Sequence, residues 1–323
     1  MTSDRAPLPL GIVGARGYVG AELLRLLAGH PQLRPGFVVS RGLAGERVED
    51  HIDGASAPGL RFEELDPAEV AARDVAAYVL ALPNGQASDH VAAISARRPD
   101  AVILDLSADH RFTAGWCYGL PERTRSRLRG ATRIANPGCY ATGAQLAIAP
   151  ALELLDGPPV IFGVSGYSGA GATPSPRNDL ARLRDNLLPY ALTGHVHELE
   201  VSHHLDRPVR FSPHVAPFFR GITLTVSLPL ARPTTRDELR ARYDAAYRDE
   251  PLVRVQTEIP EVRDAAHQDH VTLGGVDVDA RDGRRGVLVA TLDNLRKGAA
   301  SQALQNLNLA LGLDELAGLT VPA

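Results

Sequence analysis

Cys139 is the residue in this sequence best suited to covalent chemistry. It lies within residues 136–140, where a proline and a glycine predict a tight turn directly before a helix expected over residues 142–155. A cysteine at the start of a helix has its thiolate stabilised by the helix dipole and by backbone N–H groups that lack intrahelical partners. A packed core cysteine is the alternative. Because the turn can lift the side chain out of the core, we favour a nucleophile here, whereas Cys117, between two aromatic residues, suits a structural role.

A thiolate that attacks a carbonyl compound needs a partner that moves protons. Of the 11 histidines, His195 and His197 form the most concentrated group, and Glu198 and Glu200 follow them. In an extended segment residues i and i+2 point the same way, so both rings could enter one pocket, with a nearby glutamate orienting an imidazole. A buried structural histidine is an equal alternative for one of them, and the sequence leaves open which is the acid/base; His214 ranks third.

A glycine-rich segment near the N-terminus predicts a dinucleotide site. Its glycines follow the spacing G-x-x-G-x-x-G between an expected strand at residues 8–13 and an expected helix at residues 21–28. Such a loop makes a tight turn and brings backbone N–H groups to a pyrophosphate at the helix N-terminus. An ordinary turn between strand and helix is the alternative. The candidate residues are Gly14, Ala15, Arg16, Gly17, Tyr18, Val19 and Gly20.

The end of the second expected strand, residues 36–40, favours NADP as the cofactor. A site that prefers NAD places an acidic residue there, whereas this chain has Ser40 and Arg41, a hydroxyl and a guanidinium suited to a 2′-phosphate. A solvated loop residue is the alternative for Arg41. A later strand, residues 76–82, ends at the same edge of the sheet, and its end adds Leu82, Pro83 and Asn84 as cofactor contacts.

Three further segments are candidates for contacts with small ligands. Residues 165–171 are rich in small side chains and could bring backbone close to a ligand, or form a simple turn. Arg220 follows two phenylalanines and could bind a carboxylate or phosphate in a bidentate manner. Residues 293–298 close a strand and start the last helix, and there Asn294 and Lys297 could hold the nicotinamide end of the cofactor or form an ordinary helix cap.

The elements that must position these residues form two expected domains. Apolar strands at residues 8–13, 36–40, 76–82 and 101–106 alternate with helices, which predicts a doubly wound parallel sheet. After the cysteine, strands at residues 160–164, 222–230, 271–278 and 286–292, with a helix at residues 236–248, predict an antiparallel α+β domain. The boundaries are residues 1–141 for the first domain, completed by a C-terminal helix at about residues 299–323, and residues 142–298 for the second.

Composition limits the class of protein. The chain has 323 residues with 44% hydrophobic and 22% charged residues, which is ordinary for a globular protein. A net charge of -4 argues against a nucleic-acid-binding face, and two cysteines favour neither a disulfide framework nor a zinc site, so we expect no metal. With no signal-like N-terminus and no apolar run of membrane-spanning length, the expected location is the cytoplasm.

Taken in order, these stretches match one family over nearly the whole chain. The chain resembles the N-acetyl-gamma-glutamyl-phosphate reductase family, in the wider group that includes aspartate-semialdehyde dehydrogenase. The matching stretches are residues 14–20 with 22–23, 105–109, 118–122, 136–142, 165–171, 195–200, 220–221 and 293–302.

The resemblance implies a Rossmann NADP-binding domain, a catalytic and dimerising α+β domain, and assembly as a homodimer or homotetramer without nucleic acid or membrane partners. It implies that Cys139 forms a thioester with N-acetyl-γ-glutamyl phosphate, which NADPH reduces to the semialdehyde, with a histidine of residues 195–197 as acid/base and Glu200 in the catalytic set. It also implies further cofactor contacts from Ser165, Gly166, Asn294 and Lys297. The implied substrate contacts are Ser107, Arg111, Asn136, Gly169 and Arg220, with Arg220 helping phosphate to leave.

Two departures from the family pattern affect substrate detail. The usual H-R-H-x-P-E becomes His195-Val196-His197-Glu198-Leu199-Glu200, so the middle arginine is absent, and Tyr167 occupies a loop position that is often small and apolar. Two alternatives therefore stay open. One is a related reductase of aspartyl phosphate or of a carrier-bound aminoadipyl or glutamyl phosphate, and the other is a non-catalytic NADP-binding protein.

Overall fold

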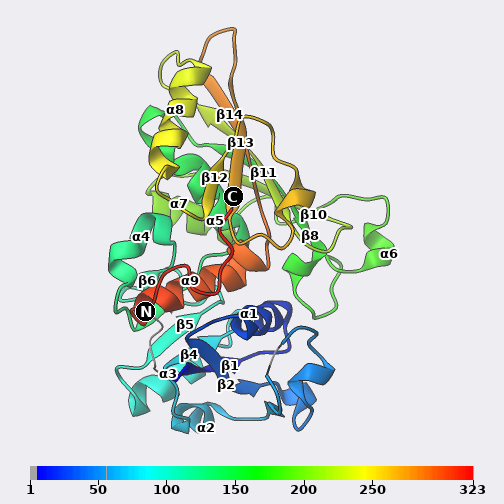
Figure 1. Cartoon of the computed structure of the whole chain (residues 1–323). Coiled ribbons are helices and arrows are strands. Elements are labelled where there is room, and N and C mark those ends of the chain that lie inside the picture. Colours follow the sequence, from blue (N-terminus) through cyan, green and yellow to red (C-terminus); the bar gives the residue numbers. More distant parts are fainter. Residues whose placement is uncertain (1–5, 56, 323) are drawn as a thin grey trace. The chain divides into compact units, whose positions relative to one another are not determined.

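The chain forms two compact units in the computed structural model, which describes residues 6–55 and 57–322. The first unit runs up to Pro137 and includes Ala299–Leu319, and the second comprises Gly138–Gly298 and the segment from Thr320 (Figure 1). The first unit thus ends at Pro137 rather than at residue 141. Cys139 lies in the second unit because it is the first residue of a helix that packs there.

The first unit is built on a seven-stranded sheet in the order β3-β2-β1-β4-β5-β7-β6, and all its paired strands are parallel. The strands are β1 (Leu8–Val13), β2 (Leu33–Val39), β3 (Phe62–Glu63), β4 (Ala77–Leu80), β5 (Val102–Asp105), β6 (Cys117–Tyr118) and β7 (Arg133–Ala135). The helices are α1 (Tyr18–Ala28), α2 (Pro67–Ala72), α3 (Ser88–Arg97), α4 (Pro121–Leu128) and α9 (Ser301–Ala310), with short 3-10 turns η1 (Arg41–Leu43) and η2 (Val48–Asp50). The doubly wound sheet predicted from alternating strands and helices is confirmed.

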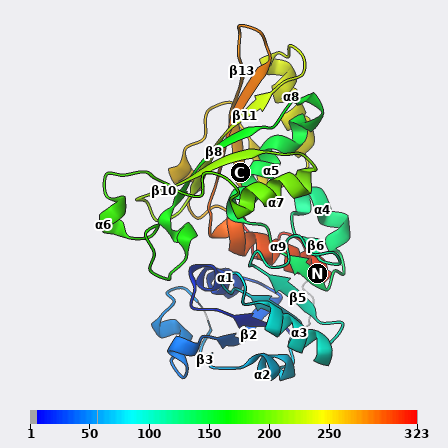
Figure 2. The same cartoon turned by 180° about the vertical axis from the view of Figure 1, so that it is seen from behind.

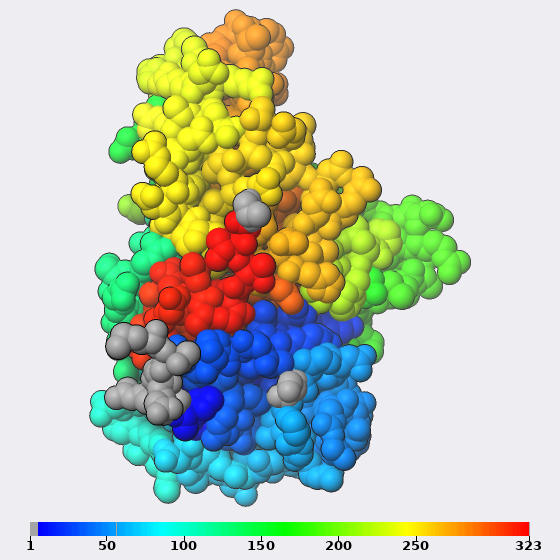
Figure 3. Space-filling view, in the orientation of Figure 1, coloured from blue at the N-terminus to red at the C-terminus, as the bar shows by residue number. Residues whose placement is uncertain are grey.

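Both faces of this sheet are covered, which explains why its strands are continuously apolar. One buried cluster joins Leu10 and Ile12 of β1 to apolar residues of α1 and α9. The other joins Val13 of β1 to Val70 of α2 and Ile94 of α3. Figure 3 shows the C-terminal segment of this unit (red) directly beside the N-terminal residues (blue), so the last helix completes the first core.

The glycine loop after β1 is a close backbone approach, which leads to a prediction about Gly14. Gly14 has φ +85°, and a Cβ there would lie 2.2 Å from the Ala81 carbonyl oxygen. We expect Gly14→Ala to lower the free energy of unfolding by about 3 kcal/mol through left-handed strain and overlap. Gly29→Ala is the matched control because φ is −101° there and nothing lies within 4 Å of its Cβ. Equal urea midpoints for the two variants would contradict the prediction.

The second unit is built on a seven-stranded mixed sheet in the order β12-β13-β14-β11-β8-β10-β9. The strands are β8 (Val160–Gly166), β9 (Leu188–Pro189), β10 (Arg210–Ala216), β11 (Ile222–Pro229), β12 (Val253–Val255), β13 (Val271–Val278) and β14 (Arg285–Leu292). The four strands predicted from the sequence, β8, β11, β13 and β14, pair antiparallel as expected, whereas β10 and β12, which were not predicted, pair in parallel with β8 and β13. Two parallel neighbours begin at the same end of the sheet, so the chain between them must cross back to that end. The composition of a strand does not reveal such a crossing.

The helices of the second unit are α5 (Cys139–Ile148), α6 (Leu180–Leu183), α7 (Val196–Leu205) and α8 (Arg236–Tyr247). Short helical turns are η3 (Ala149–Leu154), η4 (Tyr167–Ala170), η5 (Val262–Ala265) and the π-turn η6 (Arg296–Ala300). Figures 1 and 2 show the segment that carries α6 extending from this unit beyond β8 and β10. None of the helices in the described residues is long and apolar enough to cross a membrane.

Helix α5 is fixed against the sheet, and this positions the residue at its start. Gly143 lets the helix approach closely, since a Cβ there would lie 2.8 Å from Leu224 Cδ1. The far end of α5 is held by two tyrosines of α8, whose hydroxyls each donate a 2.6 Å hydrogen bond to a carbonyl oxygen of α5. The helix begins at Cys139 rather than at residue 142 and stops at Ile148, shortly before Pro150, where the chain tightens into η3.

Candidate active site

Cys139 begins α5 on a turn that a buried carboxylate holds in place. Gly138 is the N-cap residue of the helix, with φ −70° and ψ 149°. Its backbone N–H donates a 2.8 Å hydrogen bond to Oε1 of Glu200, whose side chain is fully buried. Glu200 comes from α7, so a long-range contact fixes the turn that precedes Cys139. The positive end of α5 favours negative charge on the Cys139 sulfur.

Gly298 lies against Cys139, the candidate nucleophile. A Cβ added at Gly298 would lie 2.8 Å from Cys139 Cβ, and its backbone N–H bonds the Asp293 carbonyl oxygen at 2.9 Å. The neighbouring Lys297 is fully buried. Sequence reasoning placed Lys297 near a ligand but missed the glycine, which only the meeting of α5 with residues 293–298 reveals.

His195 and His197 meet at the start of α7, although the extended segment expected there is wrong. His195 is the N-cap residue, and its Nδ1 accepts the backbone N–H of His197 at 3.1 Å. The two rings have centroids 4.8 Å apart, and both make edge contacts with the ring of Tyr140, the residue after Cys139. The helical turn thus brings the rings together by capping rather than by strand alternation. His214 contributes its carbonyl oxygen, which accepts the Tyr140 hydroxyl at 2.8 Å.

The chemistry of His195 follows from its surroundings. Burial, and next the charge of Arg177, lower the pKa of His195 to about 4, while Glu198 acts in the opposite direction. The ring is therefore neutral near pH 7. Because its Nδ1 accepts a hydrogen bond, the neutral ring carries its proton on Nε2, where it can be donated to an oxygen atom.

Tyr190 and Arg177 join this cluster without any sequence signal that pointed to them. The ring centroids of Tyr190 and His195 are 5.5 Å apart, and the Arg177 guanidinium carbon lies 5.0 Å from the Tyr190 centroid. Burial, and then the negative charge of a Cys139 thiolate, raise the pKa of Tyr190 to about 12. Burial likewise raises the pKa of Tyr140. The two phenols therefore stay protonated beside the cysteine.

Arg220 is bound to other residues of the second unit. Its Nη1 lies 3.0 Å from Oδ2 of the fully buried Asp293 and 2.9 Å from His267 Nδ1. Asn294 also has structural contacts, since its side chain accepts the Gly221 N–H at 2.7 Å and donates to Ser168 Oγ at 2.8 Å. These contacts tie the end of β14 to the segment before β11.

The small-residue segment after β8 is compact rather than an open loop. Strand β8 continues through Ser165 and Gly166, and η4 follows directly. A Cβ at Gly166 would lie 2.5 Å from the Phe219 carbonyl oxygen, and one at Gly169 would lie 2.8 Å from Ser165 Oγ. The glycines are therefore required for packing of this segment against its neighbours.

In the first unit, the glycine loop has the backbone shape that a dinucleotide needs. Gly17 is the N-cap residue of α1, and a Cβ at Gly20 would lie 2.7 Å from Ala15 Cα. The helix N-terminus thus follows directly on a loop whose Gly14 and Gly20 positions have no room for a side chain, as close approach to a pyrophosphate requires. The loop residues therefore fit a nicotinamide dinucleotide.

The end of β2 gathers positive charge. Arg41 begins η1 directly after the buried Ser40, and its side chain is 90% exposed with Nε 3.7 Å from Glu64. Arg16 of the glycine loop lies alongside, since a Cβ at Gly42 would be 3.0 Å from its Nη1. Two guanidinium groups thus lie near one strand end.

Asp109 and Asn84 join the loops that follow β4 and β5. The Asp109 carboxylate accepts the Gly85 N–H at 2.7 Å and the Ala87 N–H at 3.2 Å, and Asn84 Oδ1 accepts the Ala108 N–H at 3.0 Å. The loop predicted to contact the cofactor, Leu82 to Asn84, is thereby held by a residue that sequence reasoning left unassigned.

Three predicted substrate residues lie together in the first unit and are all buried. Ser107 Oγ donates to Asp105 at 2.9 Å, and Arg111 Nε donates to the Asn136 carbonyl oxygen at 2.9 Å. The Asn136 side chain accepts a 3.0 Å hydrogen bond from Asn306 of α9. These contacts order the carboxyl ends of β5 and β7.

Comparison with known proteins decides the family. Residues 9–131 match the semialdehyde dehydrogenase NAD binding domain, and residues 139–294 match the semialdehyde dehydrogenase dimerisation domain. A Xanthomonas campestris protein named N-acetyl-gamma-glutamyl-phosphate reductase is 58% identical, covering 97% of this chain and 98% of its own length. The chain belongs to the N-acetyl-gamma-glutamyl-phosphate reductase family. Relatives of the same name from Stenotrophomonas maltophilia and Xylella fastidiosa are 57% and 55% identical over 96% and 97% of this chain, and 97% and 95% of their own lengths.

Solved structures agree on the fold of this reductase family member. Aspartate semialdehyde dehydrogenase II from Vibrio cholerae superposes with a TM-score of 0.77 at 18% identity, covering 95% of this chain and 99% of that one. The Candida albicans aspartate semialdehyde dehydrogenase solved with NADP has a TM-score of 0.70 at 14% identity, covering 94% and 99%. The predicted family and fold are confirmed, and the first unit is a nicotinamide-dinucleotide-binding domain.

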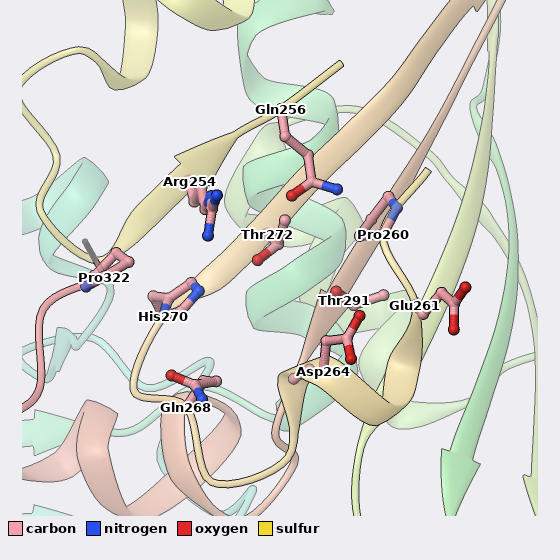
Figure 4. A pocket seen from close by; sticks show the side chains of 11 residues that line it. Arg254, Gln256, Pro260, Glu261, Asp264, Gln268, His270, Thr272, Thr291 and Pro322 are labelled. Atoms are coloured by element: carbon pink, nitrogen blue, oxygen red, sulfur yellow. The ribbon is translucent and has the colours of Figure 1, made fainter. Parts of the chain in front are cut away.

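A hollow in the second unit is lined by none of the predicted site residues. It measures about 350 Å³ and lies against β12, β13 and β14 of the second unit. Figure 4 shows Arg254 and His270 on one side of it and Asp264 and Glu261 on the other. Because none of the predicted site residues lines this hollow, the cluster around Cys139 is the candidate active site.

Proposed function

We propose that this chain reduces N-acetyl-γ-glutamyl phosphate to N-acetyl-L-glutamate 5-semialdehyde and phosphate, with NADPH as reductant. The observation that carries the proposal is the Cys139 turn, in which a nucleophile begins a helix and the buried Glu200 fixes the residue before it. The names of the relatives supply the substrate.

In the proposed mechanism the Cys139 thiolate attacks the acyl carbon. A C–S bond forms, the C–O bond to phosphate breaks, and phosphate leaves with the bonding electron pair and takes up a proton. A carboxylate is a poor hydride acceptor, whereas the resulting thioester is a good one, and this is the reason for covalent catalysis. Bound NADPH would supply the hydride. Re-formation of the carbonyl group then expels the thiolate and releases the aldehyde.

The two histidines suit two different tasks in this mechanism. His195 is neutral, with its proton on Nε2, so we propose that it donates a hydrogen bond to the oxygen on which negative charge develops. His197, in the same first turn of α7, is then the candidate for proton exchange with the substrate and with Cys139. Arg220 and Gly169 of this unit, with Ser107, Arg111 and Asn136, are proposed to order the substrate site.

The proposed cofactor contacts include the Gly14 to Gly20 loop, Asn84, and the Ser165–Gly166 and Asn294–Lys297 segments. Preference for NADPH over NADH is proposed to come from Ser40 and Arg41, because a guanidinium binds a phosphate strongly and a ribose hydroxyl weakly.

Removal of the Arg41 guanidinium tests this preference. We expect Arg41→Ala to raise the KM for NADPH roughly 10-fold or more, since a charge-assisted hydrogen bond contributes about 1.5–3 kcal/mol, while the KM for NADH stays nearly constant. Arg34→Ala is the control, because Arg34 is an exposed arginine at the other end of β2. Equal changes for both nucleotides would argue against 2′-phosphate recognition at this residue.

The experiment that tests the function is the reverse reaction. N-acetylglutamate semialdehyde, NADP⁺ and phosphate are supplied, and reduced nicotinamide is followed by absorbance, with aspartate semialdehyde and NAD⁺ in parallel. Phosphate-dependent reduction of NADP⁺ with the acetylated aldehyde supports the proposal. Turnover of aspartate semialdehyde alone would indicate a related acyl-phosphate reductase instead. Absence of turnover with every aldehyde would favour a non-catalytic NADP-binding protein.

The match to a dimerisation domain supports self-association. We propose a homodimer or homotetramer. Light scattering coupled to size-exclusion chromatography distinguishes these states from a monomer.

A further inference from the structure

Arg177 is a cation held at a defined place in the second unit. Its turn is ordered by Asn178, whose side chain donates to the carbonyl oxygens of Gly171 and Thr173 at 2.9 and 2.8 Å. Oδ1 of Asn178 accepts the Ser175 N–H at 2.7 Å, and Ser175 Oγ in turn accepts the Arg177 N–H at 3.3 Å. These contacts close the chain into a compact turn, so the direction of the arginine is set by its backbone.

This turn places the guanidinium in the ring cluster around the nucleophile. Arg177 Cζ lies 5.0 Å from the centroid of the Tyr190 ring. Tyr190 contacts His195 with ring centroids 5.5 Å apart. The His195 ring in turn contacts the ring of Tyr140, with centroids 6.4 Å apart, and Tyr140 directly follows Cys139 in α5, so Arg177 belongs to the same ring cluster as the residue after the cysteine.

Arg177 and Arg220 differ in whether a carboxylate neutralises the guanidinium charge. Arg220 shares Nη1 with the buried carboxylate of Asp293, whereas Arg177 forms no ion pair with the described residues. Glu198, the nearby carboxylate, accepts the backbone N–H groups of Gly194 and Phe211. Val196 leaves the segment between the two histidines without a cation of its own. A guanidinium without a carboxylate partner, in the ring cluster that includes Tyr140, suits an anionic ligand.

We propose that Arg177, held over the Tyr190 ring, binds the phosphate group of the acyl phosphate and stabilises it as it leaves. This inference rests on the proposed function and extends it. The phosphate lies at the carbon that Cys139 attacks, while the carboxylate of an acylated glutamyl phosphate lies at the other end of the molecule. Arg177 stays protonated throughout and transfers no proton, so it acts by charge and by its paired N–H donors. The sequence analysis expected Arg220 to help phosphate leave, and this proposal assigns that role to Arg177 instead.

The reverse reaction separates the two anions, because phosphate and aldehyde are then independent substrates. In Arg177→Ala we expect the KM for phosphate to rise roughly 10- to 100-fold, with less than about a 3-fold change in the KM for the aldehyde. Arg177→Lys keeps the charge without the planar fork and should fall between, and added guanidinium ion should partly restore the alanine variant. Arg184→Ala, an exposed arginine of the same segment, should behave as wild type.

Three results would overturn the inference. A raised KM for the aldehyde with an unchanged KM for phosphate would assign Arg177 to the substrate carboxylate. Unchanged KM values for both would remove it from binding, and equal behaviour of the Arg177 and Arg184 variants would make the effect one of general charge. Thermal unfolding of each variant within about 2 °C of wild type shows that folding is intact. Failure of the proposed function is seen separately, as absence of phosphate-dependent turnover in the wild-type protein.

Discussion

Replacing Cys139 with serine is expected to abolish acyl-phosphate reduction while leaving nucleotide binding intact. Serine keeps the size and the turn, but its hydroxyl is not ionised near pH 7 and forms an ester rather than a thioester, so the loss should be at least about 10³-fold in kcat. The glycine loop and the cofactor contacts of the first unit are untouched. NADPH binding followed by nucleotide fluorescence, together with the reverse assay, measures both quantities.

The matched control for this variant is the other cysteine of the chain. Cys117 is buried, and burial raises the pKa of its thiol, so it suits packing rather than attack. Cys117→Ala should retain activity and lower the free energy of unfolding by about 1 kcal/mol. Substantial turnover by Cys139→Ser, or loss of turnover only in the Cys117 variant, would require a different nucleophile.

Replacing Glu200 with alanine is expected to have the second-largest effect, although Glu200 need not touch the substrate. Its Oε1 accepts the Gly138 N–H at 2.8 Å in a fully buried position. Alanine would leave that N–H unpaired and open a cavity, so we expect the free energy of unfolding to fall by about 3 kcal/mol. The nucleophile turn would also relax, which should lower kcat roughly 100-fold, since small displacements of a reacting group have large effects on rate.

Glu200→Gln separates the position of this side chain from its charge. Glutamine keeps a carbonyl oxygen at the site of Oε1 and nearly the same volume, so it should retain most of the stability and a large part of the activity lost in alanine. Urea unfolding and kcat of the two variants are compared directly. A glutamine variant that folds normally but is as inactive as alanine would show that the negative charge itself is required, and would move Glu200 from positioning into proton chemistry.

The central strands and the first helix of the first unit were predictable because their signals are local, whereas β3, β6, β7, α2 and α4 were not predicted. The strand at Leu8–Val13, the glycine turn and the apolar helix after it follow directly in the chain, and each signal spans only a few residues. A parallel sheet buried on both faces requires continuous apolar strands, so the pattern is strong. The bounds of several elements shifted by a few residues, as for β2, which spans Leu33–Val39, and for α5 of the second unit, which begins at Cys139, directly after the turn glycine, rather than at residue 142.

The errors have a common physical origin in long-range pairing. Residues 195–197 were expected to be extended, but His195 caps α7. The Glu200 side chain of this helix accepts a hydrogen bond from the Gly138 N–H. In the second sheet the four predicted strands pair antiparallel, but β10 and β12, which pair in parallel with β8 and β13, were not predicted. In both cases the deciding partner is distant in the chain, and no short window of sequence contains it.

The sequence by itself determined the family of this protein and its candidate chemical groups: a cysteine at a helix start, two histidines, a glycine loop and a strand end with Ser40 and Arg41. Residue type and local spacing are enough for these, because a turn, a cap and a nucleophile are local properties. Only the tertiary structure decided which side chains support that chemistry. Glu200 reaches Gly138, Gly298 packs on Cys139, and Arg177 lies over Tyr190, since burial and side-chain contact arise only when the sheet and its helices have assembled.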